Sequence, residues 1–189
     1  MFFRTVFCFL IAAAMGASAW AQPPKWQVDG AKSSLKFVVV VNGQTVTGKF
    51  ASFGALIAFD PADLAHSSAK ITIDMTGVKS GDSTRDAMLQ KPDWFNILDF
   101  PHAVFQTTSF TSKGGNAYEA LGKLTLKGTT QDVVLPFNLA ITGNTGVMKG
   151  ETVLKRAAFK VGQGTQFETA KPVDLDVKVL VNVTATRGK

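Results

Sequence analysis

Apolar and polar residues alternate along most of the chain beyond residue 33, as expected for strands with one buried face. The clearest case is residues 133–141, where every odd position is apolar. Residues 173–187 continue the pattern with a row of valines and a leucine on one side and polar residues on the other. The same alternation predicts strands in the segments 34–41, 46–53, 55–59 and 70–75.

Turn-forming dipeptides separate these segments. Asn42-Gly43, residues 113–116 and Gly143-Asn144 each suit a tight connection. We expect about eight long strands joined mostly by hairpins, with interruptions near Ser83 and over residues 157–173. An antiparallel sheet of that length splits into a sandwich or closes on itself. Strands of roughly 8–10 residues favour an all-β closed barrel of about eight strands, filled by side chains or holding one small ligand.

Residues 83–105 form the largest interruption and read differently. Ser83 and Asp86 have the spacing of a capping box, so a short helix begins there and ends before Pro92. Five large apolar side chains then follow within seven residues, and we expect all of them to be buried in a plug at one mouth of the barrel. These are Trp94, Phe95, Ile97, Leu98 and Phe100.

The first 21 residues predict a secretory signal peptide. Arg4 precedes an apolar run that is too short for a membrane anchor, and small residues follow it before a cleavage point after Ala21. The expected mature domain is residues 22–189, exported from the cytoplasm. Cys8 is the only cysteine and lies inside the signal, so disulfides and thiol chemistry are excluded from the mature protein.

Composition argues against several functions. The formal net charge of +6 is spread along the chain instead of forming a basic stripe, so no nucleic-acid partner is expected. His66 and His102 are the only imidazoles, and no metal site is expected from them. Asp82 and Asp86 are a candidate acid–base pair, but four-residue spacing at a helix start is more typical of capping. The protein is therefore expected not to be an enzyme, with a hydrolase using Asp82 and Asp86 as one alternative.

A second alternative comes from the alternation itself, which does not say which face looks outward. Mid-strand charges such as Lys36, Lys70 and Asp74 suit a wet lumen, as in an outer-membrane β-barrel. The single tyrosine and the absence of aromatic girdles along the sequence speak against that interpretation.

The order of motifs resembles the YceI-like family of periplasmic polyisoprenoid-binding proteins. The resemblance spans nearly the whole mature chain. It rests on "WQVDGAKSSLKF", "VTGKF", "ITIDMTGVKSGDSTRDAML", "WFNILDFPHAVF", "GKLTLKGTTQDVVLPF" and "LKRAAFKVG", which begin at residues 26, 46, 71, 94, 122 and 154.

The resemblance implies an extended lipocalin-like barrel whose apolar tunnel binds a long isoprenoid, such as a polyprenyl chain or a quinone tail, with no other cofactor. Arg85 and Arg156 are the candidates for meeting a polar head group. Lys32 stands where the family often has histidine, so a head-group contact from that position is in doubt. The residues expected to line or close the tunnel are Phe37, Val39, Phe50, Ile57, Ile73, Met75, Trp94, Phe95, Phe100, Leu124, Leu126, Phe137, Leu139, Val177 and Val179.

From the residues alone, the same side chains suit a packed core equally well, because a filled barrel and an apolar tunnel use the same residue types. The resemblance favours a carrier for a small amphiphilic lipid. Transient contact with a membrane or a membrane protein fits that role, and pairing of two chains in a homodimer is left open.

Overall fold

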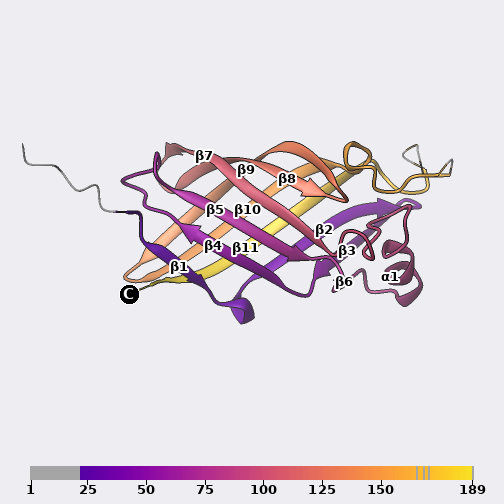
Figure 1. The fold of residues 1–189 in the computed structure, drawn as a ribbon, viewed down its shortest axis with the longest axis horizontal. Coiled ribbons are helices and arrows are strands. Elements are labelled where there is room, and N and C mark those ends of the chain that lie inside the picture. Colours follow the sequence, from indigo (N-terminus) through magenta and orange to yellow (C-terminus); the bar gives the residue numbers. More distant parts are fainter. Residues whose placement is uncertain (1–21, 165, 168, 170, 189) are drawn as a thin grey trace, which may run out of the picture.

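The computed structural model describes residues 22–164, 166–167, 169 and 171–188. The predicted signal peptide therefore lies outside the described residues. The described part is mostly antiparallel sheet, with one α-helix and two short 3-10 helices (Figure 1). The elements are β1 (Lys25–Val28), η1 (Gly30–Lys32), β2 (Ser34–Val41), β3 (Gln44–Phe50), β4 (Phe53–Ala58), β5 (Ser68–Asp74), β6 (Val78–Lys79), α1 (Ser83–Leu89), β7 (His102–Gly114), β8 (Ala117–Leu126), β9 (Thr129–Thr142), β10 (Thr145–Lys155), η2 (Arg156–Phe159) and β11 (Asp176–Arg187).

Eight of the strands close into a barrel. The order β1-β4-β5-β7-β8-β9-β10-β11 is continuous, and β1 pairs with both β4 and β11. Trp26 lies opposite Ile57 on one side of β1 and opposite Arg187 on the other, so these few residues join the two ends of the sheet. The prediction of an all-β antiparallel barrel of about eight strands with one short helix is confirmed.

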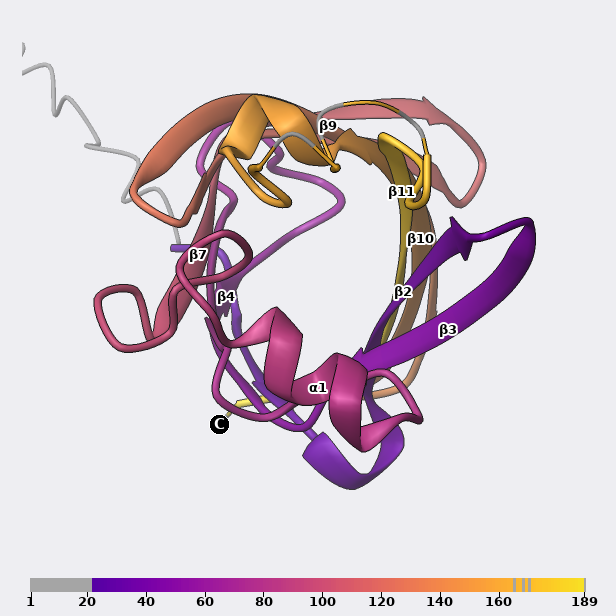
Figure 2. The same ribbon diagram turned by 90° about the vertical axis from the view of Figure 1, so that its right-hand side faces the viewer.

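The remaining strands form a three-stranded extension that we call the side sheet, made of β2, β3 and β6. It branches from β11, whose residues 178–182 pair with β2 while residues 185–187 pair with β1. In the view down the barrel, β2 and β3 diverge from the wall at the end where α1 crosses the opening (Figure 2). Gly48 lies opposite Phe37 in this sheet, and any side chain at Gly48 would strike the Phe37 ring.

The apolar face of each strand looks inward, as the alternation predicts. On β9 the odd residues Val133, Leu135 and Phe137 are buried and the residues between them are exposed. Two boundary predictions are wrong. The strand predicted over residues 46–53 ends at Phe50, and Phe53 already belongs to the next strand. The last strand begins at Asp176 and not at Val173. Residues 172–174 instead meet the end of β2 through the Val41–Val173 bridge and two backbone hydrogen bonds, which divert them from β11.

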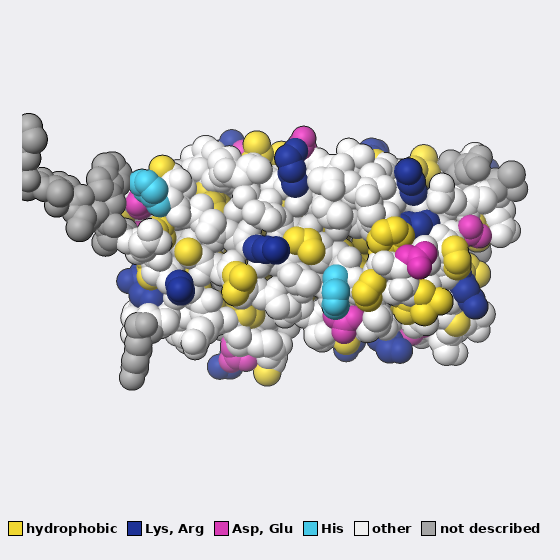
Figure 3. Space-filling view, viewed as in Figure 1, with side chains coloured by type: hydrophobic (Ala, Val, Ile, Leu, Met, Phe, Trp, Pro, Cys, Tyr) yellow, Lys and Arg dark blue, Asp and Glu magenta, His cyan; other side chains and the backbone are white. Residues whose placement is uncertain are grey.

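Charged side chains occupy the outer face, where blue and magenta groups are scattered among white ones (Figure 3). Neighbouring strands place opposite charges together there, as in the ion pairs Lys123–Asp132 and Lys178–Glu151. An outer-membrane barrel has an apolar outer band and a polar interior, which is the reverse arrangement. The alternation did not say which face of the strands looks outward, and the structure places the apolar face inside and the charged face outside. No helix in the described part of the chain is long and apolar enough to cross a membrane.

Helix α1 begins as predicted, but its cap is different. Asp82, not Ser83, is the N-cap residue, and its carboxylate accepts a hydrogen bond from the Arg85 amide at 2.8 Å. Asp86 does not reach back to Ser83. Its Oδ1 instead accepts from the amide and the hydroxyl of Ser80, at 2.6 and 2.7 Å. The helix is thereby tied to the segment that precedes it, because Ser80 is buried and needs an acceptor.

The aromatic segment after α1 is only partly buried, which corrects the expectation that all five large residues pack inside. Trp94 is buried, whereas Leu98 is 91% exposed. Leu98 sits in a turn in which the Asp99 amide donates to the Asn96 carbonyl at 3.1 Å, and the Asn96 side chain donates to Asp99 Oδ2 at 2.8 Å. That local turn, not apolar composition, decides the direction of Leu98.

These two residues give a matched stability test. Trp94→Ala should lower the free energy of unfolding by about 3–5 kcal/mol, because a large buried ring is lost. Leu98→Ala should change it by less than about 0.5 kcal/mol, because the side chain is already in water. Urea unfolding followed by circular dichroism measures both values, and equal effects of the two substitutions would contradict the packing described for this segment.

Candidate ligand-binding site

The barrel encloses two apolar cavities with volumes of about 130 and 190 Å³. They follow one another along the strands. On β11 the larger cavity is lined by residues 177, 179 and 181, and the smaller one by residues 181, 183 and 185. The two walls share five residues, so the cavities adjoin each other inside the barrel. We call the two cavities together the bore, and the five shared residues the junction: Leu35, Ile71, Phe105, Leu135 and Val181.

The walls contain most of the residues that the sequence proposed for a tunnel. Ile57, Phe137 and Leu139 line the smaller cavity. Arg85 and Phe100 line neither cavity. Phe100 lies against Gly128 in the β8–β9 turn instead. The proposed residues in the wall of the larger cavity are Phe37, Val39, Phe50, Ile73, Met75, Trp94, Phe95, Leu124, Leu126, Arg156, Val177 and Val179.

Sequence reasoning missed much of the smaller cavity and all five junction residues. Leu35, Leu135 and Val181 share the inward face with residues that were selected, so the alternation contained the signal for them. Phe105 and Phe110 were not placed on a face, because no clear alternation surrounds them in the sequence.

Aromatic rings close the bore at the β1 end. Phe59 makes edge contacts with Phe110, Tyr118 and Phe137 at centroid distances of 5.0, 5.7 and 6.4 Å. The buried Trp26 donates its Nε1–H to the Phe59 carbonyl at 2.8 Å. Arg187 stacks above the Trp26 ring at 5.3 Å. This end is thus held by both packing and a hydrogen bond.

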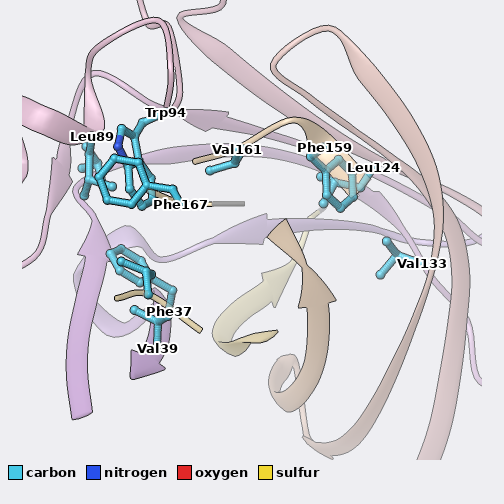
Figure 4. Packing of buried hydrophobic residues seen from close by; sticks show 11 residues of the cluster. Phe37, Val39, Leu89, Trp94, Leu124, Val133, Phe159, Val161 and Phe167 are labelled. Carbon is cyan, nitrogen blue, oxygen red and sulfur yellow. The ribbon is translucent and has the colours of Figure 1, made fainter. Parts of the chain in front are cut away.

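A second aromatic group stands at the α1 end. Trp94 contacts Phe167 edge-on at 5.1 Å. Leu89 lies beside these two rings, while Phe159 and Leu124 lie across the bore from them (Figure 4). A chain of tilted rings from Phe37 through Phe50 to Phe95, 5.6 and 6.3 Å apart, links the side sheet to the segment after α1. The larger cavity is therefore bounded by elements that are distant in sequence.

Arg156 holds the loop that follows η2. It is only 4% exposed, and its guanidinium donates to six backbone carbonyls between Val161 and Asp174. Burial lowers the pKa of Arg156 from its ordinary value, while the nearby Asp174 opposes that shift. Because every N–H of the guanidinium already donates a hydrogen bond, Arg156 contributes mainly its carbon atoms and its positive charge to the cavity wall. The Cζ atom of Arg156 lies 5.8 Å from the centre of the Trp94 ring.

Lys127 is a further buried cation that the sequence did not single out. Its Nζ donates to the Lys160 carbonyl at 2.7 Å and to Gln163 Oε1 at 3.3 Å. These bonds fasten the β8–β9 turn to the loop after η2. Burial lowers the pKa of Lys127, while Asp93 raises it. Lys127 and Arg156 together anchor the same loop over the α1 end of the barrel.

The carboxylates proposed for a hydrolase have structural partners. Asp82 caps α1 and Asp86 accepts from Ser80, and neither lines a cavity. Arg85 also turns to Ser80, with Nε 3.0 Å from its hydroxyl oxygen and Nη2 3.3 Å from its carbonyl oxygen. The three residues thus order the loop before the helix. Within the described ranges no group of three or more His, Cys, Asp or Glu side chains is arranged to hold a metal ion.

One polar atom near the larger cavity lacks a partner. The Trp94 indole Nε1–H is buried and has no hydrogen-bond acceptor among the described residues. A buried donor without an acceptor costs about 1–3 kcal/mol. The wall is otherwise formed by carbon side chains, with Thr107 and Thr152 as the remaining polar members apart from Arg156.

The fold and the bore define a class of protein: a closed antiparallel barrel with apolar cavities in its interior. The chain belongs to the YceI-like family, whose domain model matches residues 26–185.

Relatives and solved structures agree with this assignment. UPF0312 proteins of Vibrio parahaemolyticus and Yersinia pestis are 27% and 30% identical, over 75% and 67% of this chain and 76% and 66% of theirs. Burkholderia cenocepacia BcnA is 34% identical with a TM-score of 0.81, covering 85% of this chain and all of that one. A polyisoprenoid binding domain from Saccharophagus degradans is 13% identical with a TM-score of 0.69, covering 87% of this chain and 99% of its own, and shares the fold.

Arg156 should be essential for the α1 end of the barrel. Arg156→Ala removes the donors of six backbone carbonyls, four of them in buried hydrogen bonds, so we expect a loss of about 3–5 kcal/mol in the free energy of unfolding. Arg156→Lys keeps the charge but offers three donors in place of five, and should recover only part of the loss. Chemical denaturation measures both, and full stability of Arg156→Ala would show that the loop is held by other contacts.

Asp86 gives a prediction about pH. Hydrogen bonds from the Ser80 hydroxyl and amide lower the pKa of Asp86 below its ordinary value of 3.8. A carboxyl with a depressed pKa contributes stability above its unfolded pKa and loses it as pH falls through the folded pKa. Asp86→Asn should therefore be less stable than wild type at neutral pH, and the gap should narrow below about pH 4. A gap that is constant with pH would contradict the ionised role of Asp86.

Proposed function

We propose that this protein is a periplasmic carrier that buries the hydrocarbon chain of an isoprenoid lipid, either a polyprenyl chain or a quinone tail, in the bore. The observation that carries the proposal is the pair of apolar cavities that adjoin at the junction. Binding of this kind needs no chemistry at the ligand, because each buried methylene contributes about 0.8 kcal/mol. The predicted signal peptide supports the periplasmic location.

The energetic cost of an empty bore supports a ligand. An unfilled cavity costs about 24 cal/mol per Å³, so cavities of about 130 and 190 Å³ cost up to about 8 kcal/mol together. That is comparable with the whole net stability of a typical domain, about 5–15 kcal/mol. A protein that only needed a core would gain stability by filling the space with larger side chains. A bound chain restores the lost contacts without closing the bore.

The shape of the bore favours a long, thin ligand. Its two cavities lie end to end along the strands and not side by side. The residues that line the bore follow one another along the strands from the β1 end to the α1 end. The structural neighbour from Saccharophagus degradans is described as a polyisoprenoid binding domain, which supports the same ligand class by fold. An isoprenoid chain suits this lining because it is apolar along its length.

The polar end of the ligand is best placed near Trp94. The indole N–H there lacks an acceptor, and a carbonyl or hydroxyl oxygen of a ligand would supply one. The β1 end offers no comparable donor, because the Trp26 N–H already donates to the Phe59 carbonyl. The apolar tail would then run past the junction toward Trp26.

Blocking the junction tests the proposal. Val181 lines both cavities, and Val181→Trp should divide the bore. Native mass spectrometry of protein purified without detergent should show a bound lipid in wild type and a loss of long-chain lipids in the variant. In a series of prenols of increasing length, the free energy of binding to wild type should improve by about 0.8 kcal/mol per added methylene. In the variant this gain should stop at a shorter chain length.

The matched control for this experiment is Val153→Trp on the neighbouring strand. Val153 is 53% exposed and lies on the outer face of β10, so the same ring is added outside the bore. This variant should bind like wild type. If wild type carries no lipid and takes up neither prenols nor quinones, the proposed function is wrong. Equal chain-length profiles for the two tryptophan variants would show that the ligand does not pass the junction.

A further inference from the structure

Three lysines form a row on the outer face of the side sheet. The strand register places Lys36 of β2 opposite Lys49 of β3, and Lys49 opposite Lys79 of β6. All three are exposed. Adjacent strands are about 4.8 Å apart, so the three side chains rise from neighbouring positions of one surface.

A row of like charges on adjacent strands is electrostatically unfavourable. Like charges directly opposite each other destabilise a sheet, whereas opposite charges stabilise it. Several lysines on other strands follow that rule, as in the pairs Lys123–Asp132, Lys155–Asp176 and Lys178–Glu151, and the described lysines without an ion pair there do not face another lysine across the strands. In the row, Lys79 meets Asp86 at 3.7 Å, while Lys36 and Lys49 form no ion pair with any described residue. The chain therefore maintains an unbalanced positive strip at this place.

Protection of a free sheet edge does not account for the strip. Lysines often guard edge strands against pairing with other chains, and β3 has such an edge beyond its short pairing with β6. Lys36, however, lies on β2, which is paired on both sides, with β3 and with β11. Edge protection therefore does not explain why a lysine stands at position 36.

The inner face of the same strands lines the larger cavity. Phe37 and Phe50 follow Lys36 and Lys49 directly in the chain, point to the opposite face and belong to the cavity wall. A partner that contacts the lysine row is thus separated from the α1 end of the bore by a single layer of sheet. Given the proposed function, the ligand is insoluble in water and has to be collected from or delivered to a bilayer.

We propose that the outer face of the side sheet, through Lys36, Lys49 and Lys79, docks on the anionic phospholipid surface of a membrane. The row is open to solvent and lies on a sheet surface, which suits a plane of phosphate groups. Each lysine near an anionic surface strengthens binding about five-fold. Docking would bring the α1 end of the bore beside the bilayer from which the lipid passes. This inference rests on the proposed function for its purpose, but its binding test is independent of it.

The test measures sedimentation with two kinds of vesicle, one of phosphatidylcholine alone and one in which phosphatidylglycerol replaces part of it. Wild type should bind the anionic vesicles more tightly and should be released at high salt, because screening shortens the reach of exposed charges. The triple variant Lys36→Gln, Lys49→Gln and Lys79→Gln should bind them on the order of 100-fold more weakly. The triple Lys→Arg variant at the same positions should bind like wild type.

The control removes the same charge elsewhere. Lys25, Lys70 and Lys149 are exposed and lie on β1, β5 and β10. Changing these three to Gln should leave binding to anionic vesicles within a few-fold of wild type. Equal losses in both triple variants would mean that net charge alone acts, and no preference of wild type for anionic vesicles would also overturn the docking site. Competition by millimolar inorganic phosphate that abolishes vesicle binding at constant ionic strength would assign the row to a soluble anion instead.

Uptake of a prenol supplied from detergent separates the two proposals. The Lys→Gln triple variant should load like wild type from detergent but more slowly from anionic vesicles. Failure of wild type to load from either source would contradict the carrier function, while the vesicle-binding result would still stand or fall by itself.

Discussion

The interior of this barrel is wider than its own side chains can fill. The rest of the structure has to stabilise a barrel that contains this unfilled space. An eight-stranded barrel is just wide enough to be packed by side chains or to hold one small ligand. Here valines, leucines and phenylalanines line the wall without meeting across the whole width, which leaves the two cavities. The packing lost in that space must be offset by hydrogen bonding around the wall and by contacts at the ends.

The two ends meet this requirement in different ways. At the β1 end, a few residues of β1 close the sheet, and the Trp26–Phe59 hydrogen bond fixes a cluster of aromatic rings. At the α1 end the closure is made by loops, so it depends on polar anchors: Asp86 with Ser80, Lys127 with Lys160, and Arg156 with the carbonyls of residues 161–174. Loop closure is easier to open than a paired sheet. The proposed ligand would therefore enter and leave at the α1 end, beside the side sheet.

The sequence predicted the barrel well because its information is local. Alternation identifies which residues share a face, and it correctly placed Val133, Leu135 and Phe137 inside. It did not reveal that the bore is hollow, since a packed core uses the same residues, and the width depends on how strands are staggered around the barrel. The carbonyls held by Arg156 lie in a loop without any periodic pattern. Leu98 shows the converse limit, because its turn overrides the apolar composition around it.

A high-resolution crystal structure of the protein purified without detergent would show directly whether the bore holds a hydrocarbon chain. We expect elongated density that runs between Trp26 and Trp94 and passes the side chains of Phe105 and Val181, with no protein atoms in that path. A map in which the junction side chains close on one another, so that no hydrocarbon chain fits between them, would contradict a hollow, ligand-binding barrel.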